Sequence, residues 1–214
     1  MYLFSRQARL SGARFRDSIA WAIEASQRVS QTTGLELGLW SRMFSPGVGT
    51  LVWATFVPDL ATMEAANDKL MVDDGINALF ERGNDFVIPG SMDDALATVI
   101  TGTPDPNRPV EYVAIVQATL CSGKLADGIA LGVEISQRAE KITGVPSMFV
   151  ADATGNYGAV AWLSGLTDVA ELERAQVALN SDASFVEFLD KKIKGVYNDL
   201  PGSAVQLIYR RIPT

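Results

Sequence analysis

The sequence predicts an α+β protein made of two tandem β-α-β-β-α-β repeats with antiparallel sheets. Three observations support this fold class: one segment occurs twice, the predicted elements around each copy follow the same order, and similar Gly and Pro breakers separate them. With 214 residues, 48% of them hydrophobic, the chain is long enough for one large or two small packed domains.

The repeated segment reads EASQRVSQTTG at residues 24–34 and EISQRAEKITG at residues 134–144. The offset, 134 − 24, is 110 residues, and the Glu, first Ser, first Gln, Arg, last Thr and Gly positions are identical in the two copies. Each copy has the pattern of the last turns of a helix that ends at a C-terminal glycine. Because the similarity extends in both directions, the segment predicts a duplicated domain.

The first repeat is assigned to residues 1–102. Alternating or β-branched segments predict its strands, and segments with helical periodicity predict its helices. Asp59 is expected to cap the second helix, which breaks and restarts at Asp73. The predicted strands are 2–10, 35–43, 50–57 and 95–101, and the predicted helices are 14–33, 59–71 and 73–86.

The second repeat is assigned to residues 110–214, after a linker at 103–109 in which three prolines favour an extended backbone. Its hairpin loop is one residue shorter, so the offset becomes 109 and pairs Trp53 with Trp162. Strands are expected at 110–120, 145–152 and 204–211, with one more through Trp162, and helices at 124–143, 168–179 and 182–194.

A β-α-β-β-α-β unit is the ferredoxin-like, or split βαβ, motif. Helices cover only one face of its sheet, and two such sheets joined into a closed barrel would cover the other faces and remove the edges. On this element order, the duplication and the broken second helix, the chain resembles the dimeric α/β-barrel superfamily in its tandem-repeat form. The sequence leaves open whether the barrel closes within one chain or between two chains.

The resemblance implies a ligand site between the sheet and its helices or inside the barrel. Members of the superfamily include cofactor-independent monooxygenases, haem-handling enzymes, muconolactone-type isomerases and NIPSNAP-like proteins. This chain departs from the haem branches because it contains no histidine. The missing histidine also removes the commonest general base and the commonest metal ligand.

The composition of the chain also argues against some classes of binding partner. The formal charge of −7 disfavours nucleic acid, and no apolar run reaches the length of a membrane span. Residues 1–10 lack the apolar core of a signal peptide, and the single cysteine, Cys121, fits a reducing cytoplasm. We therefore expect a cytoplasmic homo-oligomer with no haem or metal cofactor and with no nucleic-acid or membrane partner.

Two glutamines are candidate ligand-binding residues. Gln7 and Gln117 occupy equivalent places on the first strand of each repeat. If Ala8 and its equivalent Ala118 pack under the helices, both amides point into the barrel and could orient a polar group of a ligand. The alternative is a pair of amides that serve only as hydrogen-bonded core groups.

Two tryptophans form the second candidate set, together with the hydroxyl groups two residues after them. Trp53 with Thr55, and Trp162 with Ser164, share one face of their strands. They would form the walls of an aromatic pocket, with Trp40 nearby. The alternative is that these rings fill a barrel core.

The remaining charged pairs and the single cysteine are expected to have structural roles. Glu24 and Arg28, like Glu134 and Arg138, have the spacing of an ion pair on a helix surface. Cys121 is expected to be an unreactive thiol.

Together these features predict a protein that binds a small hydrophobic or aromatic molecule. The resemblance implies a cofactor-independent monooxygenase or isomerase, although no general base can be named. The alternative is a non-catalytic ligand-binding protein, or an oligomeric structural subunit.

Overall fold

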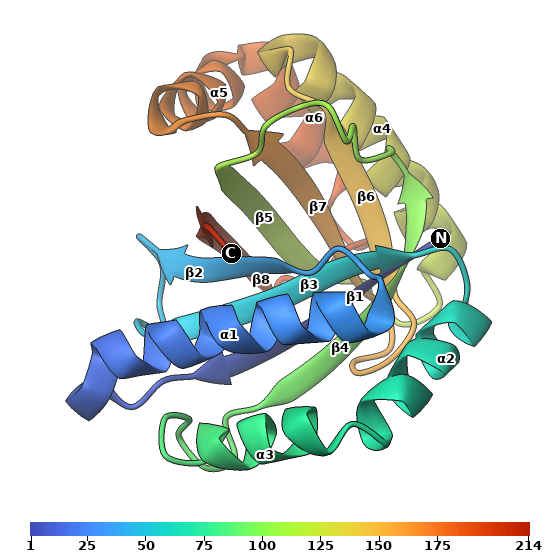
Figure 1. The fold of residues 1–214 in the computed structure, drawn as a ribbon. Coiled ribbons are helices and arrows are strands. Elements are labelled where there is room, and N and C mark those ends of the chain that lie inside the picture. Colours follow the sequence, from blue (N-terminus) through green and yellow to red (C-terminus); the bar gives the residue numbers. More distant parts are fainter. The chain divides into compact units, whose positions relative to one another are not determined.

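The helices and strands of the computed structural model follow the order that the sequence predicts (Figure 1). The structure describes residues 1–214, with every side chain except that of Ala13. The first repeat contains β1 (Tyr2–Arg9), η1 (Gly12–Arg14), α1 (Phe15–Thr33), β2 (Gly38–Met43), β3 (Thr50–Val57), α2 (Leu60–Met71), α3 (Asp74–Gly83) and β4 (Asp93–Thr101). The second contains β5 (Tyr112–Thr119), α4 (Leu125–Thr143), β6 (Ser147–Asp152), β7 (Ala159–Leu166), α5 (Val169–Ser181), α6 (Ala183–Lys192) and β8 (Ala204–Ile212).

The strands form one antiparallel closed barrel in the order β1-β3-β2-β8-β5-β7-β6-β4. In each repeat the third strand is central: β3 pairs with β1 and β2, and β7 pairs with β5 and β6. A closed barrel has no unpaired edge to protect. The predicted α+β fold class, two tandem ferredoxin-like repeats in a dimeric α/β-barrel arrangement, is confirmed.

By internal packing the chain divides into two compact units. Unit 1 contains Met1–Leu96 with Arg210–Thr214, and unit 2 contains Ala97–Tyr209. The units differ from the repeats because β4 and β8 each contribute to both units; the second part of β4, for example, pairs with β6. The predicted boundaries at 1–102 and 110–214, with a linker at 103–109, describe the duplication and stay a prediction.

In unit 1, α1 packs on one side of the β1-β3-β2 sheet because alternate strand positions are apolar. Leu51 and Trp53 on that side pack in one cluster with Trp21 of the helix. The helix ends at Gly34, whose φ of 79° is left-handed and whose amide donates to the Ser30 carbonyl at 2.8 Å. We call the sheet side that packs on helices of its own unit the helix-covered face, and the other side the helix-free face.

Unit 2 repeats this construction with different side chains. Phe149 and Trp162 pack in one cluster with Leu131 of α4. The helix ends at Gly144, whose φ is 70° and whose amide donates to the Glu140 carbonyl at 2.8 Å. The glycine ends of the two long helices were both predicted from the repeated segment, and both are confirmed.

The break in the second helix of each repeat is confirmed as well. Each helical piece begins at an aspartate whose carboxylate accepts a backbone N–H three residues later, which satisfies one of the free amides of a first turn. The bond from the Thr62 amide also lowers the pKa of the Asp59 carboxyl. The four caps are Asp59, Asp73, Asp168 and Asp182.

One predicted ion pair is wrong, and two helices end earlier than expected. Glu134 accepts hydrogen bonds from Arg138 as predicted, at 2.8 Å from Nη2. In the first repeat, however, Glu24 pairs with Arg82, and Arg28 pairs with the cap Asp73 at 3.1 Å. The reason is tertiary, since α3 lies against α1; Arg82 belongs to α3, and Asp73 is its N-cap. Helix α3 itself ends at Gly83, three residues before its predicted end, and α6 ends at Lys192, two residues before its predicted end.

None of the helices in the described part of the chain is long and apolar enough to cross a membrane.

Candidate functional site

The six predicted ligand-binding residues do not share one surface. In the β1–β3 pair, Gln7 lies opposite Val52, whereas Trp53 lies opposite Arg6. Directly opposed residues of antiparallel strands share a face, and successive residues alternate between faces. Gln7 therefore lies on the helix-free face and Trp53 on the helix-covered face. The two candidate sets therefore lie on opposite faces of the sheet in unit 1.

Trp53 is a core residue beneath α1. Its side chain is only 7% exposed, its Nε1 donates to the Ala22 carbonyl at 3.4 Å, and its ring lies 5.9 Å from that of Trp21. Thr55, two residues later, shares this face and is also buried. The alternative interpretation of an aromatic core filler describes Trp53 correctly.

Trp162 has the same role in unit 2. Its Nε1 donates to the Gly132 carbonyl at 2.8 Å, and its ring lies 5.1 Å from Phe149 and 5.6 Å from Tyr197. Burial raises the pKa of Tyr197, so its neutral hydroxyl donates to a helix carbonyl within the same core. Ser164 lies on this helix-covered face too, opposite Ala114.

The two glutamines lie on the helix-free faces, where they were expected. Gln7 is half-buried, and its Oε1 accepts a hydrogen bond from Arg42 Nη2 at 3.2 Å. Gln117 lies opposite Ala161 and is exposed. A role of either amide in ligand binding stays a prediction.

Gln7 belongs to a group that the sequence analysis did not assemble. On the helix-free face of unit 1, Trp40 lies opposite Val52, on the same side as Gln7, and Arg42 follows two residues later on β2. The guanidinium of Arg211, at the end of β8, lies 5.9 Å from the centre of the Trp40 ring. We call these four residues, Gln7, Trp40, Arg42 and Arg211, the arginine–tryptophan cluster. Strand alternation gives Trp40 and Arg42 one face, but only the fold brings Arg211 to them.

Two glycines make room for this cluster. A Cβ atom at Gly38 would lie 2.7 Å from Trp40 Nε1, so the indole extends along the strand over a residue without a side chain. A Cβ at Gly47 would lie 2.9 Å from Arg42 Nη1, and Gly47 has a left-handed φ of 89° in the hairpin loop. The Pro46 carbonyl of that loop accepts from Arg42 Nη1 at 3.3 Å.

A pocket of about 320 Å³ lies at one end of unit 2. It is formed by the end of β5, the loop into α4, the first turn of α4 and the loop between β6 and β7, and we call it the end pocket. The backbone fixes its two sides together, because the Leu120 amide donates to the Gly158 carbonyl at 2.9 Å. The lining residues are Leu120, Cys121, Ser122, Gly123, Leu125, Ala126, Tyr157 and Gly158.

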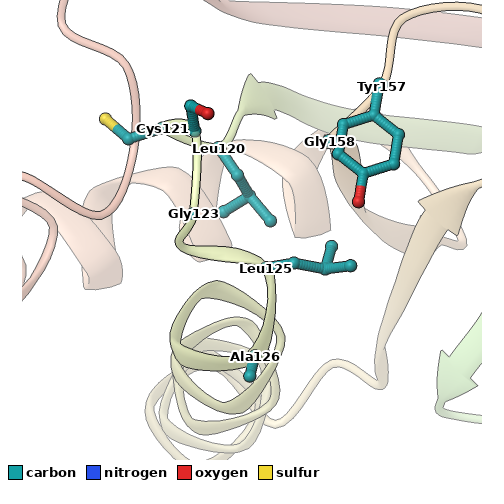
Figure 2. Close-up of a pocket in the computed structure, with 8 residues that line it drawn as sticks. Leu120, Cys121, Gly123, Leu125, Ala126, Tyr157 and Gly158 are labelled. Atoms are coloured by element: carbon teal, nitrogen blue, oxygen red, sulfur yellow. The ribbon is translucent and has the colours of Figure 1, made fainter.

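Figure 2 shows how the side chains border this pocket. The ring of Tyr157 extends from the hairpin loop, and the side chains of Leu120 and Leu125 lie on the α4 side. The sulfur of Cys121 points away from Tyr157. Tyr157 is 87% exposed, so its ring is accessible at the edge of the pocket.

The charged groups near the end pocket are paired with each other. Lys124, at the start of α4, lies 2.9 Å from the carboxylate of Asp127, and this hydrogen bond raises the pKa of Lys124. The pocket walls are thus mainly apolar, with the hydroxyls of Ser122 and Tyr157 as polar groups. Among the residues whose side chains are described, no group of three or more Cys, Asp or Glu residues could hold a metal ion.

Comparison with known proteins relates this chain to others by fold. No protein-family model matches the chain, and no curated protein sequence matches it. A candidate monooxygenase from Fusobacterium nucleatum is 7% identical, with a TM-score of 0.70 over 99% of this chain and 92% of that chain. A candidate monooxygenase from Lactobacillus acidophilus is 8% identical, with a TM-score of 0.64 over 98% of this chain and 93% of that chain.

An anthrone oxidase-like protein is also similar, at 8% identity and a TM-score of 0.67 over 99% of this chain and 91% of that chain. At such identities the likeness concerns the fold and not the activity. The chain therefore has the dimeric α/β-barrel fold, with two ferredoxin-like repeats in one polypeptide.

Proposed function

We propose that this protein binds a small, mainly apolar molecule with an aromatic ring in the end pocket of unit 2. The observation that carries the proposal is the pocket of about 320 Å³ beside the exposed ring of Tyr157. This volume is at the lower end of the range of about 300–1,000 Å³ that is typical of small-molecule sites. An aromatic ligand packed between Tyr157 and Leu125 would cover both side chains and would gain ring–ring contact.

The reaction class that we propose, if the bound molecule is a substrate, is cofactor-independent oxygenation or isomerisation. It is supported by the superfamily resemblance and by fold neighbours named as candidate monooxygenases and as anthrone oxidase-like. The reactive groups that line the pocket are the thiol of Cys121 and the hydroxyls of Ser122 and Tyr157. The contacts described above include no base that would activate any of these groups. A ligand carrier without catalysis is the second candidate, which the apolar walls favour.

The proposal is tested by calorimetric titration with 2-naphthol, a neutral aromatic probe. Tyr157→Ala should weaken binding about 3- to 10-fold, because a lost aromatic contact is worth about 0.5–1.5 kcal/mol beyond its buried area. Stability should hardly change, since Tyr157 is exposed. The matched control is Val48→Ala, the equivalent position in the first repeat, which should bind the probe normally. Unchanged affinity in Tyr157→Ala and in Leu125→Ser would overturn the assignment of the end pocket.

Native mass spectrometry of the purified protein tests three accompanying proposals. We expect a homo-oligomer, no haem or metal adduct, and any retained small molecule in a fixed ratio to the chain. A haem or metal adduct would contradict the proposal of cofactor-independent chemistry, and a monomer mass would contradict self-association.

A further inference from the structure

We propose that the end pocket of unit 2 also takes a protein ligand, which is the ring of Phe44 from a second copy of this chain. Phe44 lies at the start of the loop between β2 and β3, and its side chain is 74% exposed. This role rests on the proposed function, because it uses the same pocket for an aromatic ring. It adds a partner and a means of regulation, since self-association and small-molecule binding compete for one site.

One end of unit 1 carries exposed apolar side chains from three connecting segments, which are the turn before α1, the β2–β3 loop and the α3–β4 loop (Figure 1). Backbone hydrogen bonds join these segments. The Leu10 amide donates to the Gly49 carbonyl at 2.9 Å, and the Ser11 amide to the Phe86 carbonyl at 2.7 Å. Single apolar side chains are ordinary on a surface, but several at one end are typical of an interaction surface. We call this group the hairpin surface: Phe15, Phe44, Val48, Ile88 and Met92.

The backbone holds Phe44 in a strained conformation. Its φ of 50° is left-handed, and among the residues described it is the only non-glycine residue with a positive φ. Bulky residues avoid this region, and such strain is found mainly at functional sites. Hydrogen bonds order the loop around it, from Ser45 Oγ to the Met43 carbonyl at 2.9 Å and from Thr50 Oγ1 to the Gly47 carbonyl at 2.7 Å. An exposed ring on an ordered loop loses little entropy when it enters a pocket.

The end pocket has the size and the lining that an incoming phenylalanine ring requires. Its volume is about 320 Å³, and Tyr157 and Leu125 border it (Figure 2). These two side chains are 87% and 45% exposed, so water surrounds much of their apolar surface until another group covers it. A ring between them would gain stacked or edge-to-face contact with Tyr157. An exposed ring and a separate apolar pocket on the same chain are the elements of a head-to-tail contact.

Charge favours contact between unlike ends of two copies over contact between two hairpin surfaces. Arg9 and Arg16 are exposed beside the hairpin surface. The equivalent positions of the second repeat have the neutral residues Thr119 and Ala126, and Asp152 adds a carboxylate directly before the hairpin loop that lines the pocket. Two hairpin surfaces would bring arginines together, whereas a hairpin surface on an end pocket lets opposite charges face each other.

The expected consequence is a concentration-dependent site. Because the two surfaces differ, each copy offers one ring and one pocket, and the contact joins copies head to tail. A small molecule in the pocket would favour separate copies. Reciprocally, a high protein concentration would lower the apparent affinity of the pocket for the small molecule.

The test is sedimentation velocity of two variants, alone and mixed. Phe44→Asn removes the ring and introduces a residue that tolerates a left-handed φ, so it should unfold at the same or a higher temperature. The pocket variant combines Leu125→Ser with Tyr157→Ala. Each variant alone should associate at least about tenfold more weakly than the unmodified protein. Their equimolar mixture should form a dimer of one copy of each and nothing larger, because one intact ring then meets one intact pocket.

Met71→Ser is the control, since Met71 is 69% exposed on α2 and lies outside both surfaces; it should associate normally. A monomer at every concentration of the unmodified protein would overturn the proposal, and so would normal association of a folded Phe44→Asn variant. A mixture that stays monomeric would overturn it as well. Normal association of the pocket variant alone would assign the contact to two hairpin surfaces and would also contradict it.

Titration with 2-naphthol separates this inference from the function proposed above. Saturating 2-naphthol should shift the unmodified protein toward monomers. If 2-naphthol binds in the end pocket and the copies stay associated, the inference fails and the proposed function stands. If the mixed variants form their dimer and 2-naphthol does not bind, the proposed function fails and the inference stands.

Discussion

The two repeats fill the same helix–sheet core with rings from different elements. In unit 1 the ring that packs on Trp53 comes from helix α1, as Trp21, and the strand offers Leu39. In unit 2 the equivalent helix position is Leu131, and the ring that packs on Trp162 comes from strand β6, as Phe149. Exchange of a large and a small residue between facing elements keeps the core volume nearly constant, which is the condition for a stable packed interior.

The helix-free faces differ in chemistry and not only in shape. Unit 1 has Gln7, Trp40 and Arg42 on this face, whereas unit 2 has an apolar cluster around Val150. Asp152, on the same strand face as Val150, has a raised pKa because partial burial disfavours its charged form. Both repeats therefore keep an apolar helix-covered face, whereas their helix-free faces carry different chemistry.

The residues that line the end pocket of unit 2 also differ from those at the equivalent positions of the first repeat. Leu125, Ala126 and Tyr157 of unit 2 correspond to Phe15, Arg16 and Val48 of the first repeat. The aromatic ring thus sits on the hairpin loop in one repeat and at the start of the helix in the other.

The strongest test of the core comparison is to remove the conserved ring from each repeat. Trp53→Ala and Trp162→Ala should each lower the free energy of unfolding by about 3–5 kcal/mol, because both rings pack in cores and donate to helix carbonyls. Urea denaturation followed by circular dichroism measures the change. A loss below about 1 kcal/mol in Trp162→Ala, with weaker 2-naphthol binding, would restore the pocket role that the sequence suggested.

A smaller effect should follow from the helix glycine that accommodates Phe149. A Cβ at Gly132 would lie 2.1 Å from Phe149 Cζ, so Gly132→Ala should destabilise the protein by about 1–3 kcal/mol through overpacking. The first repeat has Ala22 and Leu39 at the equivalent positions. The double variant Gly132→Ala with Phe149→Leu should therefore be more stable than Gly132→Ala alone. If the stability losses of Gly132→Ala and Phe149→Leu simply add in the double variant, the two positions do not compensate for each other in packing.

The smallest effect concerns the start of α5, where the second repeat has Glu171 and the first has Thr62. Hydrogen bonds from the Thr167 amide at 2.7 Å and from Arg108 at 2.8 Å lower the pKa of Glu171 below its ordinary value of 4.5. A lowered folded pKa means that the stabilisation is complete above about pH 4.5 and is lost as the pH falls through the folded value.

Glu171→Gln should therefore cost about 1 kcal/mol at pH 7, because the amide keeps only one acceptor oxygen. The difference from the unmodified protein should shrink toward zero as the pH is lowered below 4.5. Thermal unfolding across this pH range measures both quantities. Glu173→Gln, on the same helix and exposed, is the control and should change stability by less than about 0.5 kcal/mol. A pH-independent loss would refute the electrostatic explanation.

The duplication, the element order and most element ends follow from the sequence alone. Strand alternation, helical periodicity, aspartate caps and C-terminal glycines are local signals, and they placed α2 at Asp59 and the end of α1 at Gly34 correctly. These features depend on neighbours within a few residues, so one sequence contains all the information that they need.

The packing of the helices on the sheet sets which face of each strand is covered, and it also sets which distant side chains meet each other. A shift of one residue moves a side chain to the other face, and this single choice separated Trp53 from Gln7. The partner of Glu24 and the approach of Arg211 to Trp40 likewise depend on elements far apart in the chain. Such contacts are set by how whole helices and strands pack, and no local pattern in the sequence specifies them.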